Sequence, residues 1–473
     1  MDDVGEVRRG ILEGFPERAT FSLPSWFPET WLTGLKAAAR LSPVAVLLVT
    51  SLAWLAVPVF HPEEWKLTIA DQFLRVTAGS TVALLCLQLA AKYFRRPAPF
   101  VGPRHYRVVL FSFVVLESAV FLYLASTATP RGVEIMADGQ KYADMGLGFA
   151  ANGDFVVNGK PTHHSPPLYP LYLSIFFAVS PTFVAQQTAV AVIFFASMVA
   201  VFECTRRLYG TDWGLLACTL VFCVPSFTFP TSRNYAEPLV LITFTIALFA
   251  VMRSFEPGKR KWIVVAGAFA GLLYLSKSAL GPFFFLALGM VLVWRAWYAG
   301  RGIVKDRWYL IAGLVAMSLI LPWVARNIAL FWDGSAAGLP VAWQTSAEFA
   351  RMWHFSLVLH PDRFLAALPT VAGLAVLFLA PFALALYAPL RSALRLAGRE
   401  DVGALWMAIV IPIIVTVLIS SVIYVQEITW IKNWEWMNQR SFFHESRYLV
   451  IVLVPMVWAS ALARRIDRKE GRA

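Results

Sequence analysis

The sequence predicts an all-α protein that crosses a membrane many times. Of its 473 residues, 58% are hydrophobic and only 15% are charged, whereas a soluble globular chain carries about 25% charged residues. So few charges could not coat the surfaces of the roughly two to four domains that a soluble chain of this length would form. The apolar residues also gather in long runs, and a bilayer-crossing helix needs about 20 mostly apolar residues. These observations exclude a disordered chain and a soluble enzyme.

The apolar runs predict the individual helices. Twelve of them approach the length of a membrane span, so we expect about 12 transmembrane helices, with a range of 11 to 13. The runs cover roughly residues 43–60, 72–91, 108–127, 183–203, 213–231, 237–254, 262–277, 279–297, 308–325, 368–388, 404–424 and 447–463.

A thirteenth apolar run, residues 168–181, is shorter than the others. It lies between a proline cluster that begins at Pro166 and a single proline at Pro181. We expect a juxtamembrane or re-entrant helix there, held against protein, in place of a further span.

The distribution of basic residues predicts the orientation of the chain. With both termini in the cytoplasm and residues 168–181 not crossing, 28 of the 41 Lys and Arg residues fall on the cytoplasmic side. The cytoplasmic segments then carry a net charge of +14 and the outer segments −2, as the positive-inside rule requires. The basic excess is therefore topological, and we expect a lipid bilayer and no nucleic acid as the partner of these charges. Three outer loops, 128–182, 326–367 and 425–446, are where we expect the function.

The first outer loop contains the first candidate catalytic residue, Asp138. Asp138, Tyr142, Met145 and Phe149 recur at helical spacing, which predicts a short amphipathic helix on the membrane with the carboxylate at its N-terminal end. The helix dipole stabilises a carboxylate there, so capping of the helix is the alternative role.

Glu237 is the second candidate acid. It begins an apolar run close to hydrocarbon depth, where an ionised group costs about 2.5–3.5 kcal/mol on insertion scales. It therefore needs a partner or a function, and an ion pair with nearby Arg233 is one alternative. Two outer carboxylates suit general-base or metal-supported activation of an acceptor hydroxyl.

Basic residues at the outer span ends form a second set. They lie on the side that is poor in positive charge, so topology does not explain them. Several such groups around one point would hold a lipid-linked phosphate and stabilise it as a leaving group, whereas single residues of this kind also extend to lipid head groups. The set consists of Arg233, Lys277, Arg326 and Arg447.

Adjacent histidines, His163 and His164, close the first outer loop. They are either solvated, or one of them bonds a phosphate or a sugar. A third clear metal ligand is lacking, so we expect no certain cofactor, and a divalent metal ion is left open.

These motifs follow one another in an order that resembles that of a known family. It runs from Asp138 and Tyr142 through Pro166-Pro167-Leu168-Tyr169-Pro170 and Ala236-Glu237-Pro238-Leu239 to Pro322-Trp323, Arg326-Asn327 and Arg447-Tyr448. This order is similar to the order of motifs in the GT-C integral-membrane glycosyltransferases. Within that class, the chain is most similar to the protein mannosyltransferase and aminoarabinose transferase branch. The resemblance covers residues from about Val108 to Ala463.

The resemblance implies an enzyme that transfers a sugar from a polyprenyl-phosphate carrier, with inversion, on the non-cytoplasmic face. Asp138 and Glu237 would match the family's two acidic positions, and Tyr142, His163, His164, Tyr169 and Tyr448 would bind substrate. Lys277 stands where many members have arginine before proline, and His164-Ser165 stands where many have a basic residue before Pro-Pro.

The resemblance also divides the chain. Residues 1–42 would form a cytoplasmic segment, 43–107 an added pair of helices, 108–325 the glycosyltransferase-like module, and 326–473 the C-terminal helices. We therefore expect an inner (plasma) membrane enzyme whose active site faces the periplasm or cell exterior and whose acceptor is a glycan, lipid or protein. A secondary transporter or flippase, and a ligase of lipid-linked glycans, are the alternatives.

Overall fold

The computed structural model describes the chain between residues 137 and 331, except 158, 163–164, 223–226, 228–233, 257, 278–279 and 300–306. It also describes scattered helical positions within 108–122 and 451–461. The expected helices in 1–107 and 332–450, with most of the C-terminal module, lie outside the described residues.

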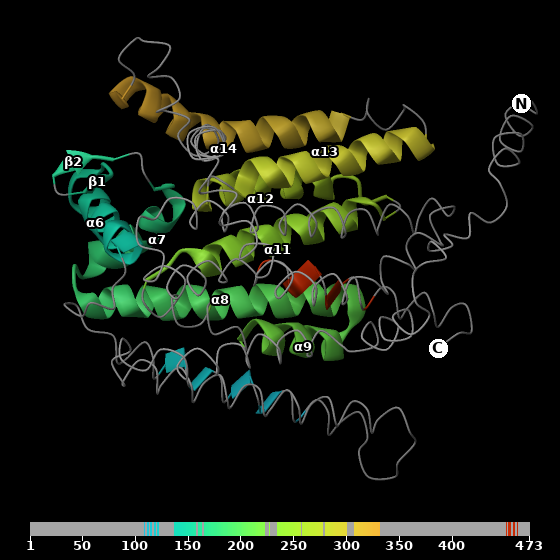
Figure 1. Cartoon of the computed structure of the whole chain (residues 1–473), viewed down its shortest axis with the longest axis horizontal. Coiled ribbons are helices and arrows are strands. Elements are labelled where there is room, and N and C mark those ends of the chain that lie inside the picture. The colour runs from blue at the N-terminus through green and yellow to red at the C-terminus, as the bar shows by residue number, and fades with distance from the viewer. Residues whose placement is uncertain are drawn as a thin grey trace, which may run out of the picture.

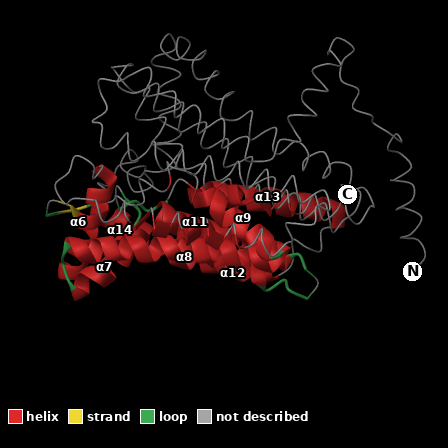
Figure 2. Cartoon of the chain, turned by 90° about the horizontal axis from the view of Figure 1, so that it is seen from below, coloured by secondary structure: helices red, strands yellow, loops and turns green. Residues whose placement is uncertain are grey.

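The described part is helical apart from one short hairpin beside α6 (Figure 2). Its elements in chain order are α6 (Ala137–Asn152), β1 (Val156–Val157), β2 (Lys160–Pro161), α7 (Leu168–Val179), α8 (Phe183–Tyr209), α9 (Thr211–Phe222), α11 (Glu237–Ser254), α12 (Trp262–Ser276), α13 (Leu280–Ala299) and α14 (Arg307–Phe331).

These helices follow the apolar runs of the sequence closely. Three of the described helices, α8, α11 and α14, are long and apolar enough to cross a membrane. Helix α7 has 12 residues, and at 1.5 Å per residue it spans about 18 Å, well short of a hydrocarbon core about 30 Å thick. Its length agrees with the expectation that it does not cross. Helix α12, which was expected to cross, has 15 residues and is also one of the shorter apolar helices.

The helices pack side by side as a bundle. Helix α11 lies between α8 and α12, and α12 also packs on α14 (Figure 1). Small residues permit the second contact: a Cβ at Gly267 of α12 would stand 2.3 Å from the Ala312 carbonyl oxygen of α14. Most side chains of α11 are buried, so this helix forms the centre of the described bundle.

The amphipathic helix α6 packs on α7 at one end of this bundle (Figure 1). Tyr142, Ala143 and Met145 are its buried residues in that contact region. A Cβ at Gly146 would lie 3.0 Å from Leu173 Cβ, so the close approach of α6 and α7 depends on the missing side chain.

The hairpin follows α6 and is antiparallel, with Val156 opposite Pro161 and Val157 opposite Lys160. Phe155, Met145, Leu275 and Trp323 form one buried cluster. This cluster joins the hairpin and α6 to the ends of α12 and α14, and it brings the segment that contains them against the bundle.

Candidate functional site

The expected site residues that the structure describes lie at one end of the bundle. The first turn of α6, the first residue of α11, the last turn of α12 and the C-terminal part of α14 meet there beside α7 and the hairpin (Figure 1). Residues as far apart in the sequence as Asp138 and Arg326 thus contribute to one region.

Asp138 lies in the first turn of α6, which begins at Ala137. This is the local structure that the spacing of Asp138, Tyr142, Met145 and Phe149 predicted. The backbone carbonyl of the next residue, Gly139, accepts a hydrogen bond from outside the helix, as described below.

Glu237 is the first residue of α11, and its side chain is only 2% exposed. Lys277, which ends α12, places its Nζ 3.7 Å from Glu237 Oε1 and is 19% exposed. A buried carboxylate requires a compensating charge, and Lys277 supplies one. Arg233, the partner that the sequence suggested, lies outside the described residues.

Asn234 connects three segments of the site. Its Nδ2 donates to the Gly139 carbonyl oxygen at 2.7 Å, and the Tyr169 hydroxyl donates to its Oδ1 at 2.9 Å. Both side chains are fully buried, where an unsatisfied polar group costs about 1–3 kcal/mol. Asn234 was not among the residues predicted from the sequence, although an asparagine in a polar interruption between two apolar runs is a signal for such a turn.

The two tyrosines of this region are part of the packed core. The Tyr142 and Tyr169 rings meet edge to face with centroids 5.3 Å apart, and both side chains are buried. This arrangement favours a structural role for both, and substrate binding by them stays a prediction.

Arg326 of α14 bonds to the residues just before the first strand of the hairpin and just after the second. Its Nη2 and Nε donate to Asp154 Oδ1 at 2.6 and 3.2 Å, and further bonds run to the carbonyls of Phe155 and Thr162 and to Asn327 Oδ1. The guanidinium also lies 5.0 Å from the Trp323 ring centroid and 5.5 Å from that of Phe155. We call this set of contacts the Arg326 clamp.

The clamp changes how Arg326 is interpreted. A guanidinium has five N–H donors, and all five are directed at protein acceptors here. A phosphate would have to replace some of these contacts, so the phosphate-binding role of Arg326 stays a prediction. Asp154 was not predicted from the sequence either, because nothing local marks the partner of an arginine 172 residues away.

Asp154 shows the electrostatic effect of the clamp. Partial burial raises the pKa of its carboxyl, but the hydrogen bonds from Arg326 and the Phe155 N–H outweigh this effect and leave the pKa below its ordinary value of 3.8. The folded chain therefore keeps this carboxylate ionised to a lower pH than an ordinary aspartate.

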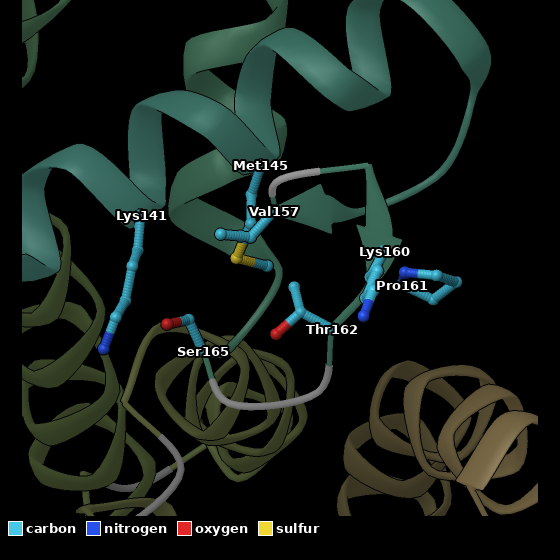
Figure 3. Close-up of a pocket in the computed structure, with 7 residues that line it drawn as sticks. All are labelled: Lys141, Met145, Val157, Lys160, Pro161, Thr162 and Ser165. Carbon is cyan, nitrogen blue, oxygen red and sulfur yellow. The ribbon is translucent and has the colours of Figure 1, made fainter.

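A small pocket opens between α6 and the hairpin, with a volume of about 230 Å³. The side chain of Lys141, one helical turn after Asp138, and that of Lys160 of β2 stand at opposite sides of it (Figure 3). Its remaining lining is Met145, Val157, Pro161, Thr162 and Ser165. Ligand pockets for drug-sized molecules measure about 300–1,000 Å³, so this one fits a single small group.

Several expected site residues lie outside the described residues. These are Arg233, His163, His164, Arg447 and Tyr448, together with the side chain of Asp138. Within the described part of the chain, no three His, Cys, Asp or Glu residues are grouped so that they could hold a metal ion.

Residues 164–325 match the family model of the dolichyl-phosphate-mannose-protein mannosyltransferases. The match confirms that the chain resembles the GT-C glycosyltransferases. It begins at His164 and ends one residue before Arg326, so it includes Tyr169, Asn234, Glu237 and Lys277 and leaves out Asp138.

One solved structure that matches this chain is the crystal structure of ArnT from Cupriavidus metallidurans bound to undecaprenyl phosphate. The TM-score is 0.48 and the sequence identity 17%, over 78% of this chain and 62% of that one. The chain thus corresponds to less than two thirds of that protein. No curated protein sequence matches this chain.

Proposed function

We propose that the protein is a glycosyltransferase that moves a sugar from a polyprenyl-phosphate-linked donor to an acceptor hydroxyl. The observation that carries this proposal is the buried pair of Glu237 and Lys277. It lies within the segment that matches the mannosyltransferase family and at the same end of the bundle as the first turn of α6. A carboxylate, an ammonium group and a second acid at one end of the bundle suit sugar transfer from a lipid phosphate, because a base can activate the acceptor and a cation can stabilise the leaving group.

In the proposed reaction Asp138 acts as general base. It takes the proton of the acceptor hydroxyl, whose oxygen forms a bond to the anomeric carbon while the bond from that carbon to the phosphate oxygen breaks. The electron pair of the broken bond stays on the lipid phosphate, and in-line attack inverts the anomeric centre. A positioned base contributes about 10²–10⁴-fold to such a step.

Lys277 is proposed to stabilise the departing phosphate. Negative charge grows on the phosphate as the bond breaks, and a cation that is already in place stabilises it without reorganisation. Glu237 compensates the charge of Lys277 in a region of low exposure and fixes where the ammonium group lies. Arg233, Arg326 and Arg447 are proposed as further phosphate contacts, and His163 and His164 as contacts of phosphate or sugar.

The pocket between α6 and the hairpin is proposed to admit part of the acceptor. It begins one helical turn from Asp138, and its volume suits a single small group. The acceptor is a glycan, a lipid or a protein, and the two lysines at the pocket favour one with a negative charge nearby. Tyr142, Tyr169 and Tyr448 complete the proposed substrate-binding set.

We further propose that this end of the bundle faces away from the cytoplasm in an inner or plasma membrane. Both termini would then be cytoplasmic, and residues 43–107 would be a pair of helices added to the transferase module of 108–325. The charge distribution in the sequence supports this orientation. A divalent metal ion is left open as an additional factor.

A transporter or flippase, the alternative from another class, predicts ionisable side chains near the middle of the membrane. In the described spans the charged residues instead lie towards the helix ends: Glu203, Arg206 and Arg207 in α8, Glu237 and Arg253 in α11, and Arg307 and Arg326 in α14. This placement favours the transferase. A ligase of lipid-linked glycans would use the same chemistry at the donor phosphate. The identity of the donor that supports transfer would separate such a ligase from the proposed glycosyltransferase.

The test is transfer of radiolabelled sugar from a panel of polyprenyl-phosphate sugars to membrane extracts by wild type and Asp138→Asn. We expect the variant to lose about 10²–10⁴-fold of the turnover. Asp144→Asn is the matched control, because Asp144 lies on the same helix and accepts a hydrogen bond from Gln140 within it. Wild-type turnover by a normally folded Asp138→Asn protein would refute the proposed base.

A further inference from the structure

Asn234 has an unusual backbone conformation. Its φ is 70°, and it is the one non-glycine residue with positive φ in the described part of the chain. Asparagine enters the left-handed region more readily than most residues, but such conformations persist only where the surroundings determine them, and they cluster at functional sites. The surroundings here are two buried hydrogen bonds.

The chemistry of these bonds fixes the orientation of the amide. A backbone carbonyl only accepts, so the Asn234 nitrogen must face Gly139 and its oxygen must face Tyr169, whose hydroxyl then donates. Both polar atoms of the amide therefore make a hydrogen bond, the nitrogen as donor and the oxygen as acceptor. An ionised aspartate lacks the donor and serine lacks the second polar atom, so asparagine is the residue that makes both bonds in its ordinary state.

The bonds join the two acid-bearing segments. Gly139 directly follows Asp138, and Asn234 lies three residues before Glu237. Tyr169 adds α7, on which α6 packs. The first turn of α6 and the start of α11, 95 residues apart in the sequence, are thus connected through one buried side chain.

We propose that Asn234 is a positioning residue that sets the location of Asp138 relative to Glu237 and Lys277. It touches no reacting atom. It acts by holding the backbone beside Asp138 against the turn that begins α11, and Tyr169 keeps its amide in the required orientation. The inference rests on the proposed function, since it assigns Asn234 to the geometry of that reaction.

Two substitutions at position 234 separate the hydrogen bonds from the backbone conformation. Asn234→Gly keeps the positive φ accessible and removes both bonds, because glycine populates this region freely. Asn234→Asp keeps the size of the side chain and removes the donor to Gly139. Tyr169→Phe removes the bond that orients the amide and leaves the bond to Gly139 in place.

The matched control is Tyr172→Phe. Tyr172 is on the same helix, its ring stacks near that of Tyr169 with centroids 6.1 Å apart, and its hydroxyl donates to the Ala189 carbonyl oxygen at 2.7 Å. The variant therefore removes one tyrosine hydrogen bond of α7 that does not lead to either acid.

Two measurements on the full chain in detergent test the proposal. Amide hydrogen exchange of peptides from residues 137–152 should rise in Asn234→Gly and Asn234→Asp and stay at the wild-type level in Tyr172→Phe. Per folded protein, kcat should fall about 10²-fold in Asn234→Gly, the loss expected for a displacement of about 1 Å, with a much smaller change in KM for the donor. Tyr169→Phe should have an intermediate effect.

The outcomes separate this inference from the proposed function. Faster exchange in α6 with an unchanged kcat would make Asn234 purely structural, and unchanged exchange would refute the tether itself. Absence of transfer by the wild type with every donor would refute the proposed function and with it the catalytic role of Asn234, whereas the exchange measurement would still test the tether.

Discussion

The two ends of the described bundle contain similar charged residues but use them differently. At the end opposite the site, Arg206 and Arg207 both pair with Glu203 on the same helix. Arg253 and Lys259 pair with Glu256 in the turn after α11. All these partners are three or four residues apart. At the site end, Glu237 pairs with Lys277 and Asp154 with Arg326, which join different elements.

The difference indicates what each set of charges does. The local pairs have side chains that are 25–58% exposed, and partly exposed pairs between near neighbours in the sequence add little to stability. Pairs between distant segments fix tertiary structure. The pair of Glu237 and Lys277 is also largely buried, so water could not readily solvate either charge if its partner were removed. Charge alone therefore does not distinguish the two ends, whereas the sequence separation of the paired residues does.

The largest effect is expected in a labelling experiment that tests whether the two ends lie on opposite sides of the membrane. Cysteines at Asn152 and Lys261, both exposed, would report on the site end and on the opposite end. In intact cells an impermeant thiol reagent should label Asn152→Cys fully and Lys261→Cys only after permeabilisation. Labelling of Lys261→Cys alone would reverse the proposed orientation, and the unsubstituted chain gives the background from its own cysteines.

The second effect concerns the pair of Glu237 and Lys277. Glu237→Gln leaves an ammonium group in a region of low exposure without its carboxylate, and breaking such a pair costs about 3–5 kcal/mol when it is fully buried. We expect a clear fall in the unfolding temperature in detergent. The double variant Glu237→Gln/Lys277→Met should recover the unfolding temperature of wild type but not its transfer activity. If Glu237→Gln alone left the unfolding temperature unchanged, the pair would contribute as little to stability as the local pairs of the opposite end.

The third effect concerns the Arg326 clamp. Asp154→Asn and Arg326→Lys should both loosen the hairpin, because asparagine lacks the charge and lysine cannot reproduce the five-donor fork. Chymotrypsin should then cleave faster after Phe155, which is buried in the intact clamp. Asp144→Asn is the control. If Arg326 binds donor phosphate as well, Arg326→Lys should raise KM for the donor more than Asp154→Asn does.

The clamp also predicts a pH dependence. The pKa of Asp154 is lowered in the folded chain, so its contribution to stability is present above the ordinary pKa of 3.8 and is lost as the pH falls through the lowered value. Hydrogen exchange of the hairpin, corrected for intrinsic rates, should increase in that acid range. Asp154→Asn should remove this increase, and an unchanged acid response in the variant would assign it to other groups.

The smallest effect is expected from Glu203→Gln at the opposite end. Its two arginine partners stay exposed to solvent, so their charges need no replacement. The unfolding temperature and the transfer rate should both equal those of wild type. A loss of stability as large as that of Glu237→Gln would remove the distinction between the two ends.

The sequence predicted the helices well because the bilayer imposes a length on each apolar run. Expected runs 237–254 and 262–277 coincide with α11 and α12 almost to the residue. The short run that begins at Leu168 became a helix too short to cross. Helix starts at Asp138 and Glu237 were predictable too, since spacing and a proline at the second position are local signals.

The partners of the site residues were not predictable in the same way. Lys277 was expected to bind phosphate and proved to be a neighbour of Glu237, 40 residues earlier. Asn234 and Asp154 were missed because their roles depend on segments that approach only in the folded chain. The sequence pattern singled out Glu237, Lys277 and Arg326 as candidates, and their partners became visible only in the folded chain.

The 172 residues that separate Asp154 from Arg326 also bear on how the protein is made. Ribosomes add about 5–20 residues per second, so the hairpin emerges roughly 9–34 s before the arginine that holds it. During that interval the nascent hairpin lacks its anchor, and a folding factor or protease on its side of the membrane would find it accessible. We therefore expect the site end to be completed only when α14 is inserted, which makes maturation of this region a late event in biosynthesis.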